Sequence, residues 1–210
     1  NTPRWSPRGD LIAYVCRFGD SPEQICTLDV NNRQSRRLTH RHARHLLPSW
    51  SRDGRSIYYA SDSSGAFEIW KAPVSDSAEP IRVTTGGGYG AMESVDGESL
   101  FFTRTPLSGL IYRVPVRGGS EVPLGDGVRS MRLPMNFAVG PRAVYHAWSE
   151  NPTQWFEIRT FSLEDGKIRT LQRIERGLGN GMTLAPAGED FLFTTTEIRS
   201  GDLFRIDRLR

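Results

Sequence analysis

One short turn motif recurs along this chain at nearly constant intervals, and an apolar strand-like segment follows each copy. The turn reads Trp-Ser-Pro-Arg-Gly from residue 5 and Trp-Ser-Arg-Asp-Gly from residue 50, and it returns in altered form three more times. The first apolar residue after the turn falls at Ile12, Ile57, Leu100, Val144 and Phe191. The intervals between these positions are 45, 43, 44 and 47 residues. A period of this length is typical of a four-stranded propeller blade. The repeat therefore predicts an all-β fold, a β-propeller of about five blades.

The second repeat shows how one blade is built. A short inner strand is expected at 46–50, followed by a turn in which Gly54 supplies a positive φ. Three further segments, 56–61, 67–72 and 80–84, are rich in β-branched and aromatic residues and read as strands. The same order fits the other copies, and no stretch has helical periodicity. We therefore expect one propeller domain over 1–210, with repeats at about 1–39, 40–84, 85–125, 126–172 and 173–210.

A four-stranded sheet has two apolar faces, so blades are expected to stack face to face. The residues expected to fill the layers between blades are Trp5, Trp50, Ile12, Ile57, Tyr58, Phe101, Tyr145 and Phe193. The last copy reads as incomplete, with three strands. Two arrangements stay open: a five-bladed ring with one three-stranded blade, or, as we favour, the C-terminal part of a ring of six to eight blades. An unclosed blade face would invite association with another surface.

Composition narrows the classes of partner. The formal net charge is only +3 over 210 residues, which gives no reason to expect direct nucleic-acid binding. No apolar run is long enough to span a membrane as a helix, so no membrane insertion is expected. The chain carries two cysteines, Cys16 and Cys26. We place them diagonally on adjacent strands, too far apart for a bridge, and expect two free thiols.

The repeat resembles the TolB-type propeller, which is also called WD-repeat-like. The resemblance rests on the turn, on the Ile-Ala-Tyr and Ile-Tyr-Tyr strands that begin at Ile12 and Ile57, and on the closing Arg-Leu-Thr and Arg-Val-Thr segments that end at Thr39 and Thr84. It covers the whole chain and is weakest in the fourth copy. The resemblance implies a bacterial scaffold that binds other proteins and performs no reaction, with a periplasmic location slightly favoured over a cytoplasmic one. The same repeat also occurs in propellers of prolyl-oligopeptidase-like serine peptidases and behind winged-helix domains of regulators, and both alternatives stay open.

Local motifs give little support for chemistry. No G-x-S-x-G, P-loop or H-E-x-x-H motif is present, so no catalytic residue, cofactor or metal is expected. The histidine-rich stretch 40–45 is read as a solvated loop in preference to an anion patch or a metal site. The glycines at 86–90 are expected to permit close backbone packing, and Asp53 and Asp96 to accept hydrogen bonds within their own turns. Trp148, Trp155 and Phe156 are read as packing residues in preference to exposed binding anchors.

Function is therefore expected on the loops at one rim of the propeller, where rigid strands present variable segments. We expect an electropositive mouth around a central funnel, suited to an acidic protein segment or a small anion. The residues expected to bind a partner or an anion there are Arg44, His45, Tyr89, Arg129, Arg132 and Arg176.

Overall fold

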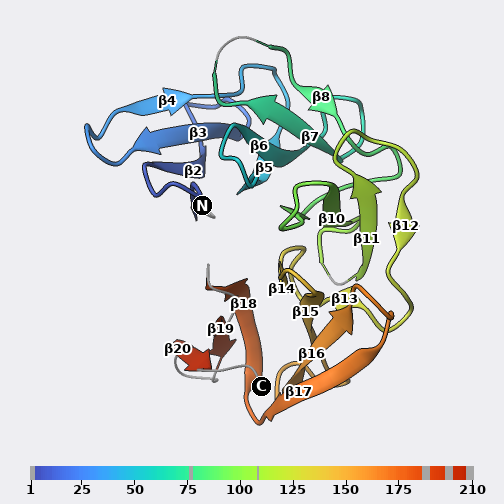
Figure 1. Ribbon diagram of the computed structural model, residues 1–210. Coiled ribbons are helices and arrows are strands. Elements are labelled where there is room, and N and C mark those ends of the chain that lie inside the picture. Colours follow the sequence, from blue (N-terminus) through green and yellow to red (C-terminus); the bar gives the residue numbers. More distant parts are fainter. Residues whose placement is uncertain (1–2, 76–77, 108, 186–189, 197–200, 207–210) are drawn as a thin grey trace. The chain divides into compact units, whose positions relative to one another are not determined.

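The computed structural model describes residues 3–75, 78–107, 109–185, 190–196 and 201–206, the last range by its backbone alone. Every regular element in these ranges is a β-strand (Figure 1). The strands of the first two repeats are β1 (Arg4–Trp5), β2 (Leu11–Cys16), β3 (Gln24–Asp29), β4 (Ser35–Arg37), β5 (His45–Trp50), β6 (Ser56–Ser61), β7 (Glu68–Pro73) and β8 (Ile81–Arg82). The third repeat contributes β9 (Ala91–Glu93), β10 (Ser99–Thr103), β11 (Gly109–Pro115) and β12 (Val122–Pro123). The remaining strands are β13 (Arg129–Ser130), β14 (Phe137–Val139), β15 (Ala143–Trp148), β16 (Phe156–Ser162), β17 (Ile168–Ile174), β18 (Gly177–Leu184), β19 (Phe191–Thr196) and β20 (Gly201–Ile206).

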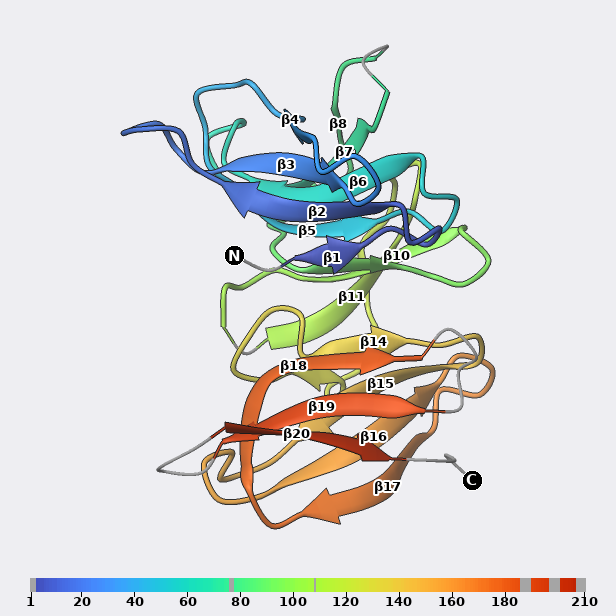
Figure 2. The ribbon, with the colours of Figure 1, turned by 90° about the vertical axis from the view of Figure 1, so that its left-hand side faces the viewer.

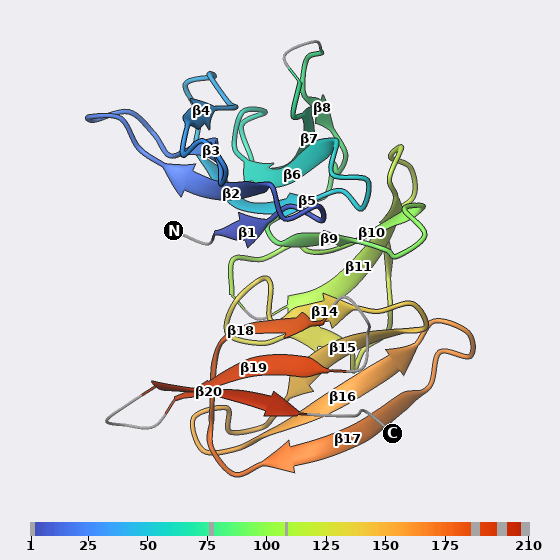
Figure 3. The same cartoon turned by 60° about the vertical axis from the view of Figure 1, so that its left-hand side comes forward.

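These strands form five antiparallel sheets that follow the repeat. The orders are β1-β2-β3-β4, β5-β6-β7-β8, β9-β10-β11-β12, β14-β15-β16-β17 and β18-β19-β20, and β13 pairs with β11. Each sheet is thus a meander in which consecutive strands are neighbours. Among the described strands the last sheet has three, side by side in Figure 3, as expected for the last repeat. The all-β propeller architecture predicted from the period is confirmed.

The chain divides into two compact units. The first contains Asn1–Thr105 and Tyr112–Val122, and the second contains Pro106–Ile111 and Pro123–Arg210. The division passes through the third sheet, whose strand β11 contributes residues to both units.

The recurring turn is closed by its serine and its aspartate. In the second sheet the Ser51 hydroxyl donates to Asp53 at 2.6 Å and accepts the backbone N–H of Ser56 at 2.9 Å, while Asp53 also accepts the N–H of Arg55. Ser94 and Asp96 close the equivalent turn of the third sheet in the same way. The expectation that these aspartates accept hydrogen bonds within their own turns is confirmed. The serine explains why the motif begins these hairpins: its side chain bonds both the turn aspartate and the backbone of the residue that opens the next strand.

A threonine that closes the fourth segment of the blade is tied to the start of the third strand. Thr39 Oγ1 accepts the backbone N–H of Ile25 at 2.9 Å and donates to Gln24 Oε1 at 2.9 Å. In the next repeat the hydroxyl of Thr84 makes the same two bonds, with the N–H of Ile69 and the carboxylate of Glu68. Both threonine side chains are buried, so this pair of bonds holds the outer part of each of these two blades onto its centre.

The second sheet buries both of its faces. Ile57, Tyr59 and Ala72 pack with Ala13 and Ile25 of the first sheet. The alternate residues of the second sheet, Tyr58, Ala60, Ile69 and Val83, form a separate cluster with Ala91, Leu100, Phe102 and Val114 of the third. In the other unit, the fourth and fifth sheets share a third cluster, which contains Ala138, Ala147, Phe156, Ile158, Leu178, Met182, Phe191 and Phe193. Successive side chains of a strand point to opposite faces, so a strand stacked on both sides must be apolar almost throughout.

The expectations for Trp5 and for the two cysteines are wrong. Trp5 does not fill a layer between blades, because its side chain is 60% exposed, whereas its repeat equivalent Trp50 is 8% exposed and donates its indole N–H to the Arg4 carbonyl oxygen. Cys16 and Cys26 are joined by a disulfide and are not free thiols. They are diagonal, as expected, since Cys26 lies opposite Tyr14, but their Cα atoms are only 5.9 Å apart. The twist between neighbouring strands shortens one diagonal and brings it within the range of a disulfide.

Candidate functional site

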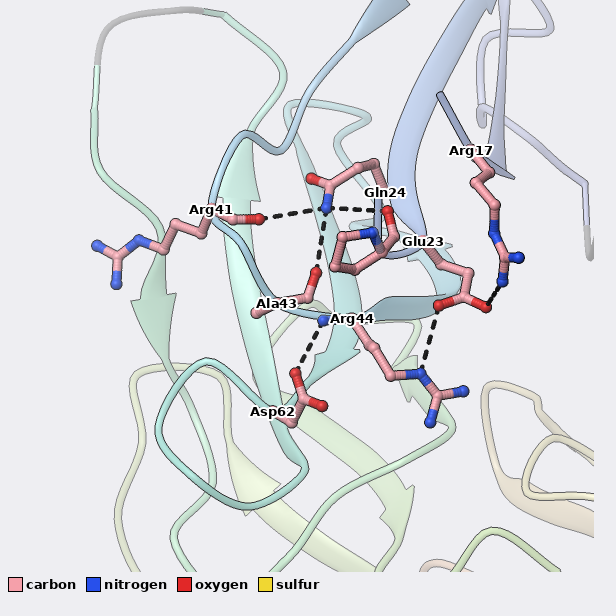
Figure 4. Close-up of polar contacts among 8 residues, drawn as sticks. Arg17, Glu23, Gln24, Arg41, Ala43, Arg44 and Asp62 are labelled. Carbon is pink, nitrogen blue, oxygen red and sulfur yellow. Dashed lines mark hydrogen bonds and ion pairs between the residues drawn. The ribbon is translucent and has the colours of Figure 1, made fainter. Parts of the chain in front are cut away.

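A buried glutamine fixes the loop that connects the first sheet to the second. The side-chain amide of Gln24, at the start of β3, donates to the carbonyl oxygens of Arg41 at 3.2 Å and Ala43 at 3.1 Å (Figure 4). The same amide reaches Pro22 O at 3.3 Å. Loop 40–44 is therefore held by a residue of the blade core, and the position of Arg44 follows from it.

Arg44 is held at three places. Its backbone N–H donates to Asp62 Oδ1 at 2.8 Å, and its Nε lies 3.3 Å from Glu23 Oε2. Its guanidinium carbon lies 5.5 Å from the centre of the Phe67 ring. The Arg44 side chain nevertheless remains 51% exposed, and Figure 4 shows its two terminal nitrogens turned away from Glu23. An exposed arginine with one defined orientation has already lost most of the side-chain entropy that binding would cost.

Glu23 links Arg44 to a second arginine. Its other carboxylate oxygen accepts a hydrogen bond from Arg17, whose side chain is largely exposed. Hydrogen bonds from its own backbone N–H and from Arg17 hold the pKa of Glu23 below its usual range. The group of two guanidinium groups and one carboxylate therefore carries net positive charge.

Two aromatic rings continue this surface. Phe67 and Tyr89 are stacked, with their ring centres 4.9 Å apart and their planes 29° apart, and both side chains are half-buried. We call Arg17, Glu23, Arg44, Phe67 and Tyr89 the Arg44 patch. It combines positive charge with an aromatic surface, so it can receive an anionic group and an apolar group side by side.

A cavity of about 400 Å³ adjoins the Arg44 patch. Its lining residues come from the loops before β3, before β5 and after β6, and they are Pro22, Arg41, His42, Ala43, Arg44, Asp62 and Ser63. A volume of this size accommodates a side chain or a small ligand.

His45 lies under the loop instead of on its surface. Its side chain is 1% exposed and meets Tyr59 edge to face, with ring centres 5.2 Å apart. Burial lowers the pKa of His45 to about 4. The neutral, buried imidazole is a packing residue here, in contrast to the expectation that it faces the funnel. The rest of the histidine-rich stretch, from His40 to Arg44, lies at the surface, as expected of a solvated loop.

The other three expected residues belong to the second compact unit. Arg129 is exposed in β13, and its Nε donates to the carbonyl oxygen of Asp126 at 3.3 Å. Arg132 is half-buried in the following loop and has a φ of 66°, and Arg176 is half-buried between β17 and β18. Arg44 and Tyr89 are thus brought together through Phe67 in the first unit, whereas these three arginines lie in the other.

The glycine-rich segment before β9 has a structural role, as expected. A Cβ added at Gly88 would lie 2.8 Å from the backbone nitrogen of Ile69, so only glycine permits this approach. Its neighbour Gly87 has a φ of 96° and donates its N–H to the Glu68 carboxylate. Glu68 thus anchors loop 85–88 as Gln24 anchors loop 40–44.

The described residues offer no metal centre and no membrane-spanning helix. No three His, Cys, Asp or Glu side chains in those ranges are grouped so that they could hold a metal ion. Within the same ranges no helix is long and apolar enough to cross a membrane.

Comparison with known proteins identifies the family. The family model of the TolB β-propeller domain matches residues 1–108. The chain belongs to the TolB β-propeller family. An uncharacterized protein of Agrobacterium fabrum is 33% identical to this TolB-family chain over 99 residues, which make up 47% of the chain and 33% of that protein.

Solved structures share the TolB fold over nearly the whole chain. TolB from Acinetobacter baumannii matches 99% of it with a TM-score of 0.77 at 19% identity, and the match covers 51% of that TolB. A protein from Agrobacterium tumefaciens assigned as TolB matches 99% with a TM-score of 0.69 at 23% identity, over 73% of its length. The acylaminoacyl peptidase of Pyrococcus horikoshii matches 99% with a TM-score of 0.64 at 16% identity, over 37% of its length. The chain thus spans a third of its curated relative and about half of the first TolB structure, and these structural likenesses establish the fold alone.

Sequence reasoning did not single out five other residues that shape the Arg44 patch in this TolB-family chain: Gln24, Glu23, Phe67, Arg17 and Asp62. The sequence did contain a signal for Gln24, because Gln24 and Glu68 occupy the same place in consecutive repeats, at the start of the third strand. A polar residue that recurs at the start of an otherwise apolar strand indicates a buried hydrogen-bonding role. No repeat pattern marks Phe67, whose contact with Arg44 depends on how two loops meet.

Proposed function

We propose that this chain is a non-enzymatic protein-binding module, and that the Arg44 patch is where a partner protein docks. The observation that carries the proposal is the fixed, half-exposed guanidinium of Arg44 over the Phe67 ring, which is itself stacked on Tyr89. Arginine and tyrosine are the residue types over-represented among binding hot spots, since each combines a large contact area with directional polar groups.

The chemistry of the Arg44 patch favours an acidic segment of the partner. The Nε of Arg44 already bonds Glu23, so its two terminal nitrogens form the edge that remains for a carboxylate. Two hydrogen bonds from one planar group to one carboxylate give direction as well as affinity. An apolar side chain next to that carboxylate would pack on the Phe67–Tyr89 stack. A small anion could occupy the same edge of Arg44, beside the cavity.

The expected residues of the second unit enter the proposal as further contacts. Arg129, Arg132 and Arg176 add positive charge on loops of that unit, and we propose that they meet a second part of the same partner. Unchanged binding after replacement of Arg132 and Arg176 with alanine would remove them from the proposal and leave the Arg44 patch unaffected.

The disulfide supports a location outside the cytoplasm. Disulfides persist in oxidising compartments such as the bacterial periplasm and are rare in the cytosol. The Cys16–Cys26 bridge therefore favours the periplasm for this chain, where a TolB-type scaffold would meet other envelope proteins.

Affinity capture with matched variants tests the function. The protein, Arg44→Ala and the control Arg55→Ala would each be immobilised and exposed to a periplasmic extract. Arg55 is also an exposed arginine of the second repeat, but it lies in the turn between β5 and β6, at the other end of that sheet. We expect a protein that is retained by the parent and by Arg55→Ala, is lost with Arg44→Ala, and binds again when purified. Equal retention by all three would refute docking at the Arg44 patch.

A second function is favoured by the likeness to acylaminoacyl peptidase. In that case the propeller would gate access to a hydrolase domain of a longer protein. Hydrolysis of a fluorogenic peptide by the protein at its natural length, blocked by a serine-directed fluorophosphonate, would establish this alternative.

A further inference from the structure

The outer edges of the sheets are protected to very different degrees. An edge strand exposes unpaired backbone groups, and proteins guard such edges with short strands or proline. The outer strands β4, β8 and β12 have three, two and two residues, and β12 contains Pro123. Strand β17, the outer strand of the fourth sheet, has seven residues and no proline (Figure 2). It is therefore the long, unguarded edge among the described four-stranded sheets.

Strand β17 is held rigidly by the rest of its sheet. It pairs with β16 from Phe161↔Ile168 to Phe156↔Ile174, with one irregularity near Ile158 and Arg159. The Thr170 hydroxyl donates to Glu157 at 3.1 Å, and the Arg173 guanidinium carbon lies 4.0 Å from the centre of the Trp155 ring. A rigid edge presents its backbone groups without an ordering cost, as an added strand requires.

The hydrogen-bond pattern shows which backbone groups point outward. The N–H of Ser162 donates to the carbonyl oxygen of Lys167, so this pair bonds inward. In an antiparallel pair the bonded positions alternate. Lys167 and Arg169 therefore bond to β16, whereas the N–H and C=O groups of Ile168 and Thr170 face away from it.

The basic side chains along this edge indicate that its partner is acidic. Residues 167–176 include four basic side chains and one acidic side chain, Glu175. Lys167 is paired with Asp165 and Arg173 with Glu175, while the exposed Arg169 has no such ion pair in the described structure. The register shift puts Arg169, opposite Thr160, and Arg173, opposite Glu157, on opposite faces of the sheet, so Arg169 is the cation, unpaired among the described residues, that an acidic strand would meet on its face.

We propose that the outer edge of β17 binds an extended acidic segment of another protein by adding it as a fifth strand to this sheet. Backbone hydrogen bonds to Ile168 and Thr170 provide the pairing, and a carboxylate of the added strand meets Arg169. The exposed side chain of Ile168 offers an apolar contact at the start of the edge. This site is independent of the Arg44 patch.

Fluorescence polarisation with a labelled peptide of alternating glutamate and valine tests the proposal. We expect it to bind the protein, and we expect at least a tenfold weaker affinity for the same peptide with alternate backbone nitrogens methylated. Arg169→Glu should weaken binding at least tenfold, whereas Arg117→Glu, which changes an exposed arginine of the other unit, should leave it unchanged.

The backbone contribution is tested separately. Thr170→Pro removes an outward N–H and should abolish binding, while Thr170→Val loses only the hydroxyl and should retain it. Hydrogen exchange should show the Ile168 and Thr170 amides protected by the peptide. Equal affinity for the methylated peptide, or no protection at these amides, would overturn the proposal. So would concentration-dependent dimerisation that Thr170→Pro abolishes, because a second copy would then occupy the edge.

Discussion

Replacing Thr84 with valine tests the account of how each blade is held together. The change keeps the shape of the side chain but removes two buried hydrogen bonds, from the Ile69 N–H at 2.8 Å and to the Glu68 carboxylate at 2.6 Å. A neutral hydrogen bond contributes about 1 kcal/mol and one to a charged group about 2 kcal/mol, so the free energy of unfolding should fall by about 3 kcal/mol. Thr39→Val is the matched control in the neighbouring repeat. Its partner Gln24 is neutral and keeps three other hydrogen bonds, so the loss should be about 2 kcal/mol.

Urea denaturation followed by tryptophan fluorescence and far-UV circular dichroism measures both losses. Native-state hydrogen exchange localises them, because the amide of Ile69 should exchange faster in Thr84→Val and the amide of Ile25 faster in Thr39→Val. A loss for Thr84→Val that equals or falls below the loss for Thr39→Val would refute the reasoning, since the charged acceptor is the main difference between the two sites.

Three further changes have defined outcomes. Burial lowers the pKa of His45 and of His146 to about 4, and an unfolded histidine titrates near 6.5, so the unfolded chain binds more protons between these values. The free energy of unfolding should therefore be highest above pH 6.5 and fall by on the order of 3 kcal/mol per histidine as the pH approaches 4. A free energy of unfolding that stays constant over this range in urea titrations would contradict this. Gly88→Ala forces a Cβ to 2.7 Å from the Ile69 side chain and should lower the free energy of unfolding by about 2–3 kcal/mol, measured by denaturation. Reducing the Cys16–Cys26 disulfide should lower it by about 2–3 kcal/mol, and two reactive thiols before reduction would show that the bridge is absent.

The Arg44 patch could be anticipated only in part. Arg44 and Tyr89 were expected on the rim because they fall in loops that join consecutive blades. His45 is one residue further along, and at that point β5 begins and the side chain turns inward beneath Tyr59. A difference of one position reverses the direction of a strand side chain, and sequence patterns locate strand ends less closely than that.

The sequence by itself determined the architecture of this protein. The period of about 45 residues, the Ser-x-Asp-Gly turns and the apolar strands such as 56–61 specify meandering four-stranded sheets, because turn chemistry and alternation act over neighbouring residues.

Only the tertiary structure decided which distant residues meet. The disulfide depends on strand twist, the exposure of Trp5 depends on which faces are covered, and the orientation of Arg44 depends on Glu23, Asp62 and Phe67 from three different segments. Such contacts are set by the packing of whole sheets and loops, which no local pattern of residues encodes.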